Sequence, residues 1–192
     1  MKIISRKDFE KNKEFYLSQI RDGKIFIYPT DTIYGIGGIA TSSSVANKIR
    51  QIKKRDSKPF SIIAPNKSWI TNNFAKSYHL NFLNKLPGPY TLIFENENTT
   101  KLVDKETVSN SNSIGIRIPN HWISKIVEDL GEPFISTSVN LSGEPPAKKV
   151  EEINKEIQNK VDYVIDDGEL NSNPSTLIDL RNQEIKEIKR EK

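Results

Sequence analysis

Hydrophobic residues along the chain alternate between helical and strand spacing from end to end, without an internal repeat, linker or low-complexity segment. Ser5-Arg6-Lys7-Asp8 has the pattern of a capping box, which predicts an amphipathic helix running through Ile20 and ending at Gly23. The β-rich run 24–28 follows at once. The chain therefore begins with a helix that leads directly into a strand.

A second helix is expected after Ser42–Ser44, because Val45, Ile49 and Ile52 recur there at helical spacing. Lys53 and Arg55 then fall near its carboxyl end. Further helices are predicted over residues 66–75, 79–86, 121–130 and 148–159, and further strands over residues 60–64, 90–95, 114–118, 133–137, 161–166, 175–180 and 184–189.

The segment 114–118 has strand periodicity, since Ile114, Ile116 and Ile118 alternate with other residues and leave Arg117 on the opposite face. Residues 96–112 are polar and predict an exposed excursion. Short connections near the carboxyl end cannot all be parallel crossovers, so the sheet must be mixed. We expect an α/β fold with a three-layer architecture, in a single domain over residues 1–192.

Composition excludes several kinds of site. The chain has no Cys and two His residues, His79 and His121. Disulfide-stabilised folds and Cys-ligated metal centres are excluded, and we predict no metal held by protein ligands. No apolar run approaches the roughly 20 residues needed to cross a bilayer, and the amino terminus lacks an apolar signal-peptide core. We expect a cytoplasmic protein without a membrane partner.

The net charge of +4 is unevenly distributed. Residues 41–70 contain seven Lys or Arg residues and one acid. Such a concentration suits an anionic partner, either the phosphates of a nucleotide or a nucleic acid backbone. A solvated basic helix end is the alternative.

Four polar segments follow apolar runs and bring hydroxyls, amides or cations next to Gly or Pro. They are Tyr28–Gly38, Lys53–Arg55, Ser136–Gly143 and Asn173–Thr176. Gly35–Ala40 formally fits G-x-G-x-x-A, but Pro29–Tyr34 separate it from the strand, which argues against a dinucleotide fingerprint. P-loop, zincin and serine-hydrolase motifs are absent from the sequence.

The residue types in these segments allow either a ligand-binding or a structural interpretation. Lys53 could hold one phosphate oxygen and Arg55 could grip two, but both could equally be favourable charges at a helix carboxyl end. The Ser136–Asn140 hydroxyls and amide could donate to phosphate or carboxylate oxygens, or serve as a turn and helix cap. His79 is expected on a helix surface, His121 in a structural role, and Trp69 and Trp122 in packing.

Taken together, the segments resemble the YrdC/TsaC family of threonylcarbamoyl-AMP synthases in its short single-domain bacterial form. YPTDTIYGIGG is similar to the family's amino-terminal segment and KKR to its K-x-R, while Ser138 and Asn140 match its S-x-N. PGPYTLIF, IGIRIPNH, STSVNLSG and NPST resemble later blocks, so the match covers nearly the whole chain.

The resemblance implies a twisted mixed sheet flanked by helices, with a basic concave cleft. It implies a nucleotidyltransferase that joins L-threonine, bicarbonate or CO2, and ATP into threonylcarbamoyl-adenylate with release of pyrophosphate. The product would serve modification of tRNA adenosine 37 by downstream transferase proteins. Mg2+ would be carried on ATP, and direct tRNA binding is possible.

The resemblance also implies roles for ten residues, carried over by position. Lys53, Arg55, Ser138 and Asn140 would be catalytic and bind ATP, with Ser113 and Arg190 as additional ATP contacts. Thr30, Arg117, Ser136 and Ser175 would bind threonine. The sequence departs from the family after Arg55, at Ile63 and at Pro146. The alternatives are a non-catalytic module that binds tRNA or double-stranded RNA, and a domain forming carbamoyl-adenylate.

Overall fold

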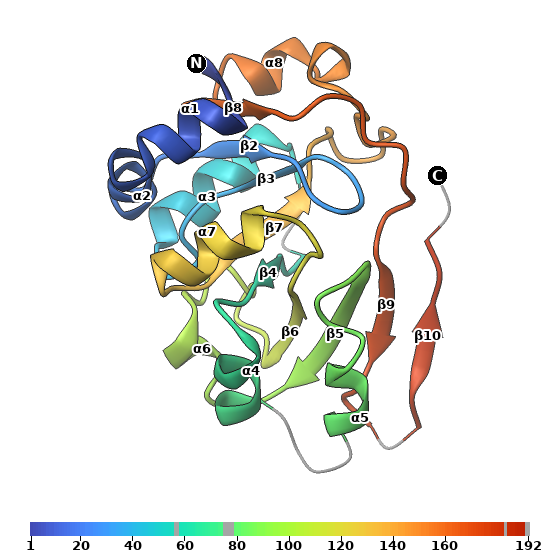
Figure 1. The fold of residues 1–192 in the computed structure, drawn as a ribbon. Coiled ribbons are helices and arrows are strands. Elements are labelled where there is room, and N and C mark those ends of the chain that lie inside the picture. Colours follow the sequence, from blue (N-terminus) through green and yellow to red (C-terminus); the bar gives the residue numbers. More distant parts are fainter. Residues whose placement is uncertain (56–57, 75–78, 183, 191–192) are drawn as a thin grey trace.

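The computed structural model describes residues 1–55, 58–74, 79–182 and 184–190, whose fold is shown in Figure 1. In these residues the strands form a ten-stranded sheet in the order β1-β8-β2-β3-β7-β4-β6-β5-β9-β10. The strands are β1 Lys2–Ser5, β2 Phe26–Tyr28, β3 Gly35–Gly37, β4 Ser61–Ile63, β5 Tyr90–Glu95, β6 Ser113–Arg117, β7 Phe134–Ser138, β8 Tyr163–Asp166, β9 Thr176–Asp179 and β10 Lys186–Ile188.

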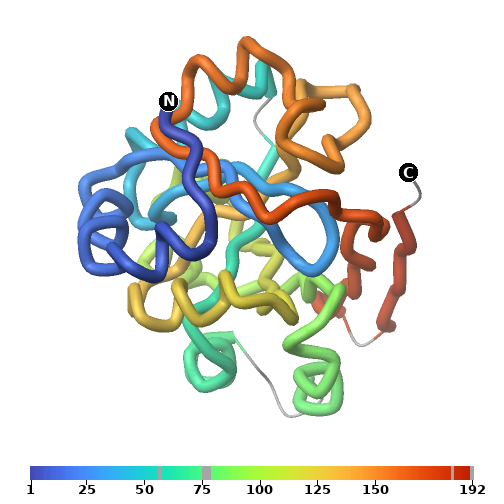
Figure 2. Tube along the Cα trace, turned by 45° about the horizontal axis from the view of Figure 1, so that its top comes forward, coloured from blue at the N-terminus to red at the C-terminus, as the bar shows by residue number. Residues whose placement is uncertain are grey.

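The sheet is mixed, as the sequence predicted. Parallel pairs join β1 to β8, β8 to β2, β4 to β6 and β5 to β9. The pairs β2–β3, β3–β7, β7–β4, β5–β6 and β9–β10 are antiparallel. Among the described residues, the first and last strands, β1 and β10, therefore form the two edges of the sheet, and Figure 2 shows the blue amino-terminal and dark red carboxyl-terminal strands on opposite sides of the molecule.

Helices flank this sheet, which confirms the predicted fold class of a single α/β domain (Figure 1). They are α1 Arg6–Lys11, α2 Lys13–Arg21, α3 Ser43–Ile52, α4 Lys67–Asn73, α5 Leu80–Leu83, α6 Thr99–Leu102, α7 Ile123–Leu130, a 3-10 turn at Val150–Glu152 and α8 Lys155–Gln158. The Ser42 hydroxyl accepts from the Val45 backbone N–H at the start of α3, as predicted. Helix α3 buries Val45, Ile49 and Ile52.

The predicted first helix is wrong in its length. The Ser5–Asp8 capping box exists, but the helix stops at Lys11 and a second begins at Lys13. Asn12 causes the break, because its backbone leaves helical geometry at φ −119° and its side-chain amide donates to the Asp8 carbonyl at 3.0 Å. Strand β1, which precedes both helices, was not predicted.

Two other regions correct the sequence interpretation. The helix expected over 148–159 is a 3-10 turn followed by the four-residue α8, since Ile153 and Asn154 have extended backbone between them. Residues 96–112 are more than an exposed excursion: they include α6 and bury Thr99, Val103 and Val108. Apolar and hydroxyl side chains spaced irregularly within a polar segment still reached the core.

The glycine-rich run after Tyr34 forms a strand, β3, which was not among the predicted strands. It lies between β2 and β7. A Cβ atom on Gly37 would lie 1.9 Å from the Ile135 carbonyl oxygen, so the close approach of β7 requires glycine there. This packing brings the segments that flank β3 and β7 together at one place.

His79 corrects another prediction. It was expected on a helix surface, but the residue is 2% exposed and its Nε2 lies 3.0 Å from the Leu180 carbonyl oxygen. Its ring also meets the edge of Phe94. His121 has the structural role expected: its Nδ1 accepts from the Ile123 backbone N–H at the start of α7. Trp69 and Trp122 pack against the core, as predicted.

Candidate functional site

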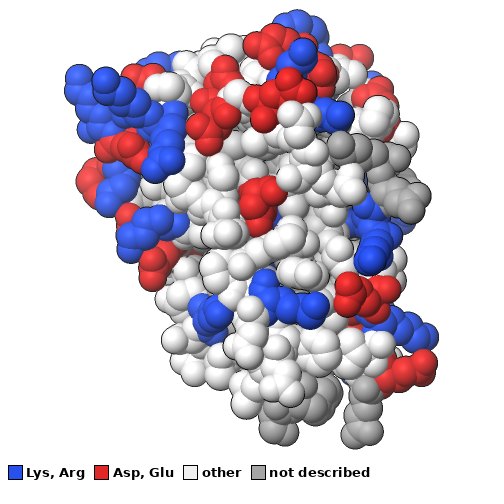
Figure 3. Space-filling model, turned by 45° about the vertical axis from the view of Figure 1, so that its right-hand side comes forward, with Lys and Arg blue, Asp and Glu red and all other residues white. Residues whose placement is uncertain are grey.

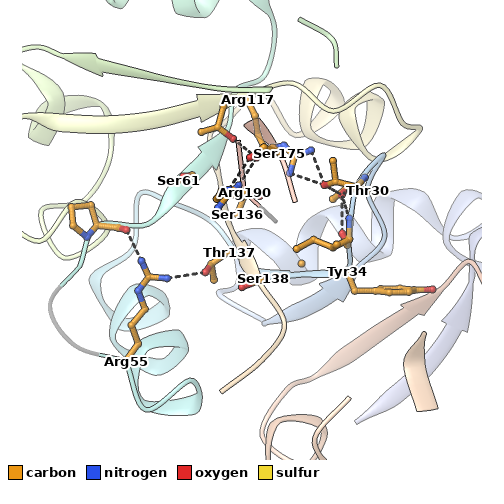
Figure 4. Close-up of a pocket in the computed structure, with 15 residues that line it drawn as sticks. Thr30, Tyr34, Arg55, Ser61, Arg117, Ser136, Thr137, Ser138, Ser175 and Arg190 are labelled. Atoms are coloured by element: carbon orange, nitrogen blue, oxygen red, sulfur yellow. Dashed lines mark hydrogen bonds between the residues drawn. The ribbon is translucent and has the colours of Figure 1, made fainter. Parts of the chain in front are cut away.

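A polar cavity of about 120 Å³ lies where several strand ends and loops meet (Figure 4). This volume far exceeds the roughly 10–15 Å³ that one water molecule needs. Figure 4 shows side chains from the loop after β2, the end of α3 and the ends of β6 and β7 directed toward the same space. The lining residues are Thr30, Thr32, Ile33, Tyr34, Gly35, Arg55, Pro59, Ser61, Thr91, Arg117, Ser136, Thr137, Ser138, Ser175 and Arg190.

Thr30 shapes the loop that forms one wall. Its hydroxyl donates to the Ile33 carbonyl at 2.8 Å and accepts from the backbone N–H groups of Thr32 and Ile33. The hydroxyl also lies 2.9 Å from that of Thr32. Because these bonds satisfy a buried hydroxyl, Thr30 orders the 30–33 turn in this structure.

Arg117 is the most deeply buried cation in the cavity wall, at 6% exposure. It lies opposite the buried Ile116 face, as strand alternation predicted. Its Nη2 donates to Asp31 at 2.5 Å, and both Nη atoms lie 3.3 Å from the Thr32 hydroxyl. Burial lowers the pKa of Arg117 and the Asp31 carboxylate opposes that shift. Its Nε is buried and lacks a hydrogen-bond partner among the described residues.

A second guanidinium comes from the carboxyl-terminal segment. Arg190 Nε donates to the Ser175 carbonyl at 2.8 Å, and its Nη2 donates to the Ser175 hydroxyl at 2.6 Å. That hydroxyl also lies 2.7 Å from the Thr91 hydroxyl. Burial and the charge of Arg117 both lower the pKa of Arg190. Two cations that disfavour one another across a cavity form a ready site for an anion.

A second pocket adjoins the first. It is lined by Lys53, Arg55, Lys58, Ser138, Asn140, Ser142 and Gly143. Arg55 and Ser138 belong to the walls of both cavities. Two ligands could therefore lie side by side and meet at this shared wall.

Lys53 ends α3 and is 2% exposed. Its ammonium donates to the Ser138 carbonyl, to the Asn140 carbonyl at 2.8 Å and to the Asn140 side-chain oxygen at 3.3 Å. These three bonds tie the loop after β7 to helix α3. Burial, followed by the charge of Arg55, lowers the pKa of Lys53 to about 7. The Ser138 hydroxyl donates to the same Asn140 side-chain oxygen.

Arg55 lies in the wall between the two cavities, where its guanidinium group is hydrogen-bonded on both Nη atoms. Its Nη1 donates to the Thr137 hydroxyl and its Nη2 to the Pro59 carbonyl, both at 3.1 Å (Figure 4). Its Nε is buried and unpartnered among the residues described. The helix-end interpretation alone does not explain this placement, because the side chain turns into the cavity wall.

Nine of the ten residues singled out from the sequence line one cavity or the other. Ser113 does not: it begins β6 opposite Glu95, four residues and about 13 Å along the strand from Arg117. Several lining residues were missed, although most stand within the motifs already quoted. The missed residues are Thr32, Tyr34, Ser61, Thr91 and Thr137, together with Asp31 behind Arg117.

Tyr34 lines the cavity, and its hydroxyl bonds to the segment that follows β8. Its hydroxyl donates to the Gly168 carbonyl at 2.7 Å and accepts from the Asp167 backbone N–H at 3.1 Å. Burial, mainly, raises the pKa of Tyr34 to about 12. Asp167 in turn accepts from the Trp122 indole N–H at 2.8 Å. Tyr34 is therefore a neutral, fixed wall rather than a proton acceptor.

The basic excess of residues 41–70 is dispersed in the structure. Lys48 lies 3.5 Å from Asp162 and Lys54 lies 2.8 Å from Glu156, while Lys53 and Arg55 turn inward. On the face in Figure 3, blue and red surfaces occur side by side around a broad uncharged area. The segment therefore supplies Lys53 and Arg55 to the cavities, while Lys48 and Lys54 pair with acids outside it.

The described residues hold no cluster of three or more His, Asp or Glu side chains that could bind a metal ion. The walls of the second pocket likewise offer hydroxyl and amide oxygens but no carboxylate among the residues described. Within the described part of the chain, no helix is long and apolar enough to span a membrane.

Fold and site define an α/β protein with an arginine-lined polar cavity next to a second cationic pocket. The chain belongs to the Sua5/YciO/YrdC family, described as "Telomere recombination", whose model matches residues 18–191. The family resemblance inferred from the motifs is thereby confirmed.

Relatives extend over most of the chain. A Methanocaldococcus jannaschii protein, provisionally named threonylcarbamoyl-AMP synthase, is 37% identical and covers 98% of this chain and 91% of its own. The threonylcarbamoyl-AMP synthase of Wigglesworthia glossinidia brevipalpis is 35% identical over 76% of this chain and 77% of its own. The family thus includes synthases of the nucleotidyltransferase type.

Two solved structures agree with the fold. P. abyssi Sua5 complexed with L-threonine has a TM-score of 0.82 at 26% identity, and covers 96% of this chain. This chain spans 55% of that longer protein. E. coli YciO has a TM-score of 0.83 at 25% identity, over 98% of this chain and 94% of YciO.

Proposed function

We propose that this protein is a threonylcarbamoyl-AMP synthase that uses L-threonine, bicarbonate or CO2, and ATP. The observation that carries the proposal is the pair of cavities with Arg55 and Ser138 in their common wall. A reaction that joins an amino acid derivative to a nucleotide needs two adjacent sites that meet at the reacting atoms. The name of the W. glossinidia relative and the L-threonine complex of P. abyssi Sua5 support the same activity.

Threonine is assigned to the polar cavity. Its carboxylate would be recognised by the free Nε of Arg117, assisted by the charge of Arg190. Ser136 and Ser175 would offer hydroxyls, while Thr30 would act by ordering the loop. The family resemblance implies an ATP contact for Arg190, but we assign it to the amino acid cavity because it hydrogen-bonds Ser175 there.

The phosphates of ATP are assigned to the second pocket. Arg55, Lys53, Ser138 and Asn140 would bind them there. In the free protein Lys53 donates to three oxygens, so phosphate binding requires it to exchange at least one of these for a phosphate oxygen. We propose that Mg2+ arrives on the triphosphate, since the described residues that line this pocket offer it no carboxylate.

The chemistry asks little covalent work of the protein. The threonine amine adds to CO2, or to bicarbonate with loss of water, and gives a carbamate. A carbamate oxygen then attacks the α-phosphorus of ATP, and the bond to pyrophosphate breaks. Lys53 and Arg55 would stabilise the charge that develops on the phosphates, and Arg117 would align the carbamate. The product would supply tRNA adenosine 37 through separate transferase proteins.

Purified protein tests the proposal directly. With Mg2+, ATP and bicarbonate, we expect pyrophosphate release that depends on L-threonine. Lys53→Ala and Arg55→Ala should each abolish turnover while the fold persists, as circular dichroism can verify. Folded wild-type protein that releases no pyrophosphate would overturn the proposal. Release on replacing threonine with carbamoyl phosphate would indicate a carbamoyl-adenylate former, and salt-sensitive tRNA binding without turnover a non-catalytic module.

A further inference from the structure

Phe60 lies buried beneath two arginine side chains. The residue is 1% exposed and directly precedes β4. The guanidinium carbon of Arg50 lies 4.6 Å from the centroid of its ring, and that of Arg55 lies 5.2 Å from it. The face of an aromatic ring carries partial negative charge, so both contacts are attractive, and they are strongest where water is excluded.

The two arginines hold different positions around the ring. Arg50 is fixed by the Lys58 carbonyl at 3.0 Å, the Glu106 carbonyl at 2.8 Å and the Ser109 hydroxyl at 3.0 Å. It therefore anchors the segment before β4 to the turn after residue 104. Arg55 instead reaches both cavities.

The backbone of Phe60 is anchored as well. Its N–H donates to the Thr107 carbonyl at 2.9 Å. The backbone that carries the aromatic ring is thus held by a neighbouring turn rather than by Arg55, and the side chain itself is buried. A fixed ring can restrict the plane of the guanidinium that lies over it.

The positive charges of Arg50 and Arg55 affect how Arg55 responds to an anionic ligand. Burial lowers the pKa of Arg55, and the nearby charge of Arg50 lowers it further. The two like charges disfavour each other, and the ring face compensates in part. A polyanion that reaches Arg55 relieves the remaining repulsion, so the pair favours an anionic ligand over a neutral one.

We propose that Phe60 is a positioning residue, which with Arg50 behind it holds Arg55 in the orientation that binds the phosphates of ATP. This inference rests on the proposed function. It assigns to a residue outside both cavity walls an effect on nucleotide affinity. The family motif around Arg55 does not by itself specify such a support.

Two substitutions test it: Phe60→Leu and Phe60→Met both keep a buried apolar side chain and remove the ring face. The matched control is Phe94→Leu, which truncates an equally buried Phe of β5 whose ring contacts Phe74 and His79. The Kd for a non-hydrolysable ATP analogue with Mg2+ is measured calorimetrically, and Tm is measured for each variant.

Loss of the ring face should weaken ATP analogue binding about threefold to thirtyfold, the range that a cation–π contact represents. Phe94→Leu should lower Tm to a similar extent and leave the Kd within about twofold of wild type. Analogue binding by either Phe60 variant that is as tight as that of Phe94→Leu would overturn the inference. Failure of the wild-type protein itself to bind the analogue would instead overturn the proposed function.

Discussion

Removing one partner of the ion pair between Arg117 and Asp31 should lower the free energy of unfolding more than the loss of any other single contact of the site. The two side chains are 7% and 10% exposed and 2.5 Å apart. The second Asp31 oxygen accepts from the Asn120 backbone N–H at 2.8 Å. Asp31→Ala therefore leaves a buried cation without its counter-charge and a backbone donor without its acceptor. Removing one partner of such a pair costs about 3–5 kcal/mol of unfolding free energy.

Urea denaturation followed by circular dichroism measures this cost. In thermal denaturation, at about 2–4 °C per kcal/mol for a chain of this size, the same loss should lower Tm by roughly 6–20 °C. Arg117→Met places an apolar side chain of similar length where the cation was. The double variant should then be less destabilised than the sum of the two single variants by about 1–3 kcal/mol, because it no longer contains a buried unpaired charge.

Glu10→Gln is the control, since it breaks the Arg6–Glu10 pair at 2.7 Å whose side chains are each 51% exposed. That substitution should change stability by no more than about 0.5 kcal/mol. Additivity of Asp31→Ala and Arg117→Met within about 0.5 kcal/mol would refute the reasoning, because it would show that the two side chains do not depend on each other.

Two further predictions concern Lys53 and Gly37. Burial lowers the pKa of Lys53 from 10.5 to about 7, so its amine is largely neutral at pH 8 and a bound polyanion should raise the pKa again. ATP binding should then take up about one proton at pH 8 and almost none at pH 5.5. Calorimetry in buffers of different ionisation enthalpy measures this proton uptake. Equal uptake at both pH values, or uptake that persists in Lys53→Arg, would contradict the assignment of the shifted pKa to Lys53. Gly37→Ala should cost about 3 kcal/mol or more in urea denaturation, because the new Cβ meets the Ile135 carbonyl. Gly168→Ala, at a left-handed position with open space around it, should cost only about 1–2 kcal/mol, and equal losses would argue against the close approach of β3 and β7.

Much of the fold could be predicted from short sequence patterns. The Ser5 and Ser42 caps depend on residues three positions away, and the alternation in β6 depends on period two, so each can be seen in a short window of sequence. The same periodicity identified Arg117 as a residue on the face opposite the isoleucines. Such features are independent of how distant segments meet.

Features that arise from distant contacts were missed. Asp31 pairs with a residue 86 positions away, and the buried His79 ring hydrogen-bonds a carbonyl 101 positions away. Ser113 shares a strand with Arg117, yet its end of the strand lies away from the cavities. No period or motif within the sequence encodes which strand ends meet; that follows from the order of strands in the sheet.

Local competition within the backbone explains the errors in helix length. Asn12 and Asn154 each use the side chain to bond nearby backbone groups, and the helix stops or restarts there. The sequence shows both residues, but whether the side chain or the helix prevails depends on packing of the flanking turns. Hydrophobic spacing alone joined segments that the backbone separates.

The shared wall of the two cavities has a thermodynamic consequence. Arg55 and Ser138 face both pockets, and β3 and β7 register Gly35 against Ser138, which links the loop after β2 to the loop after β7. We therefore expect the two proposed substrates to affect each other's binding, because both would contact Arg55 and Ser138. By linkage, the factor by which one substrate changes the affinity of the other is the same in either direction.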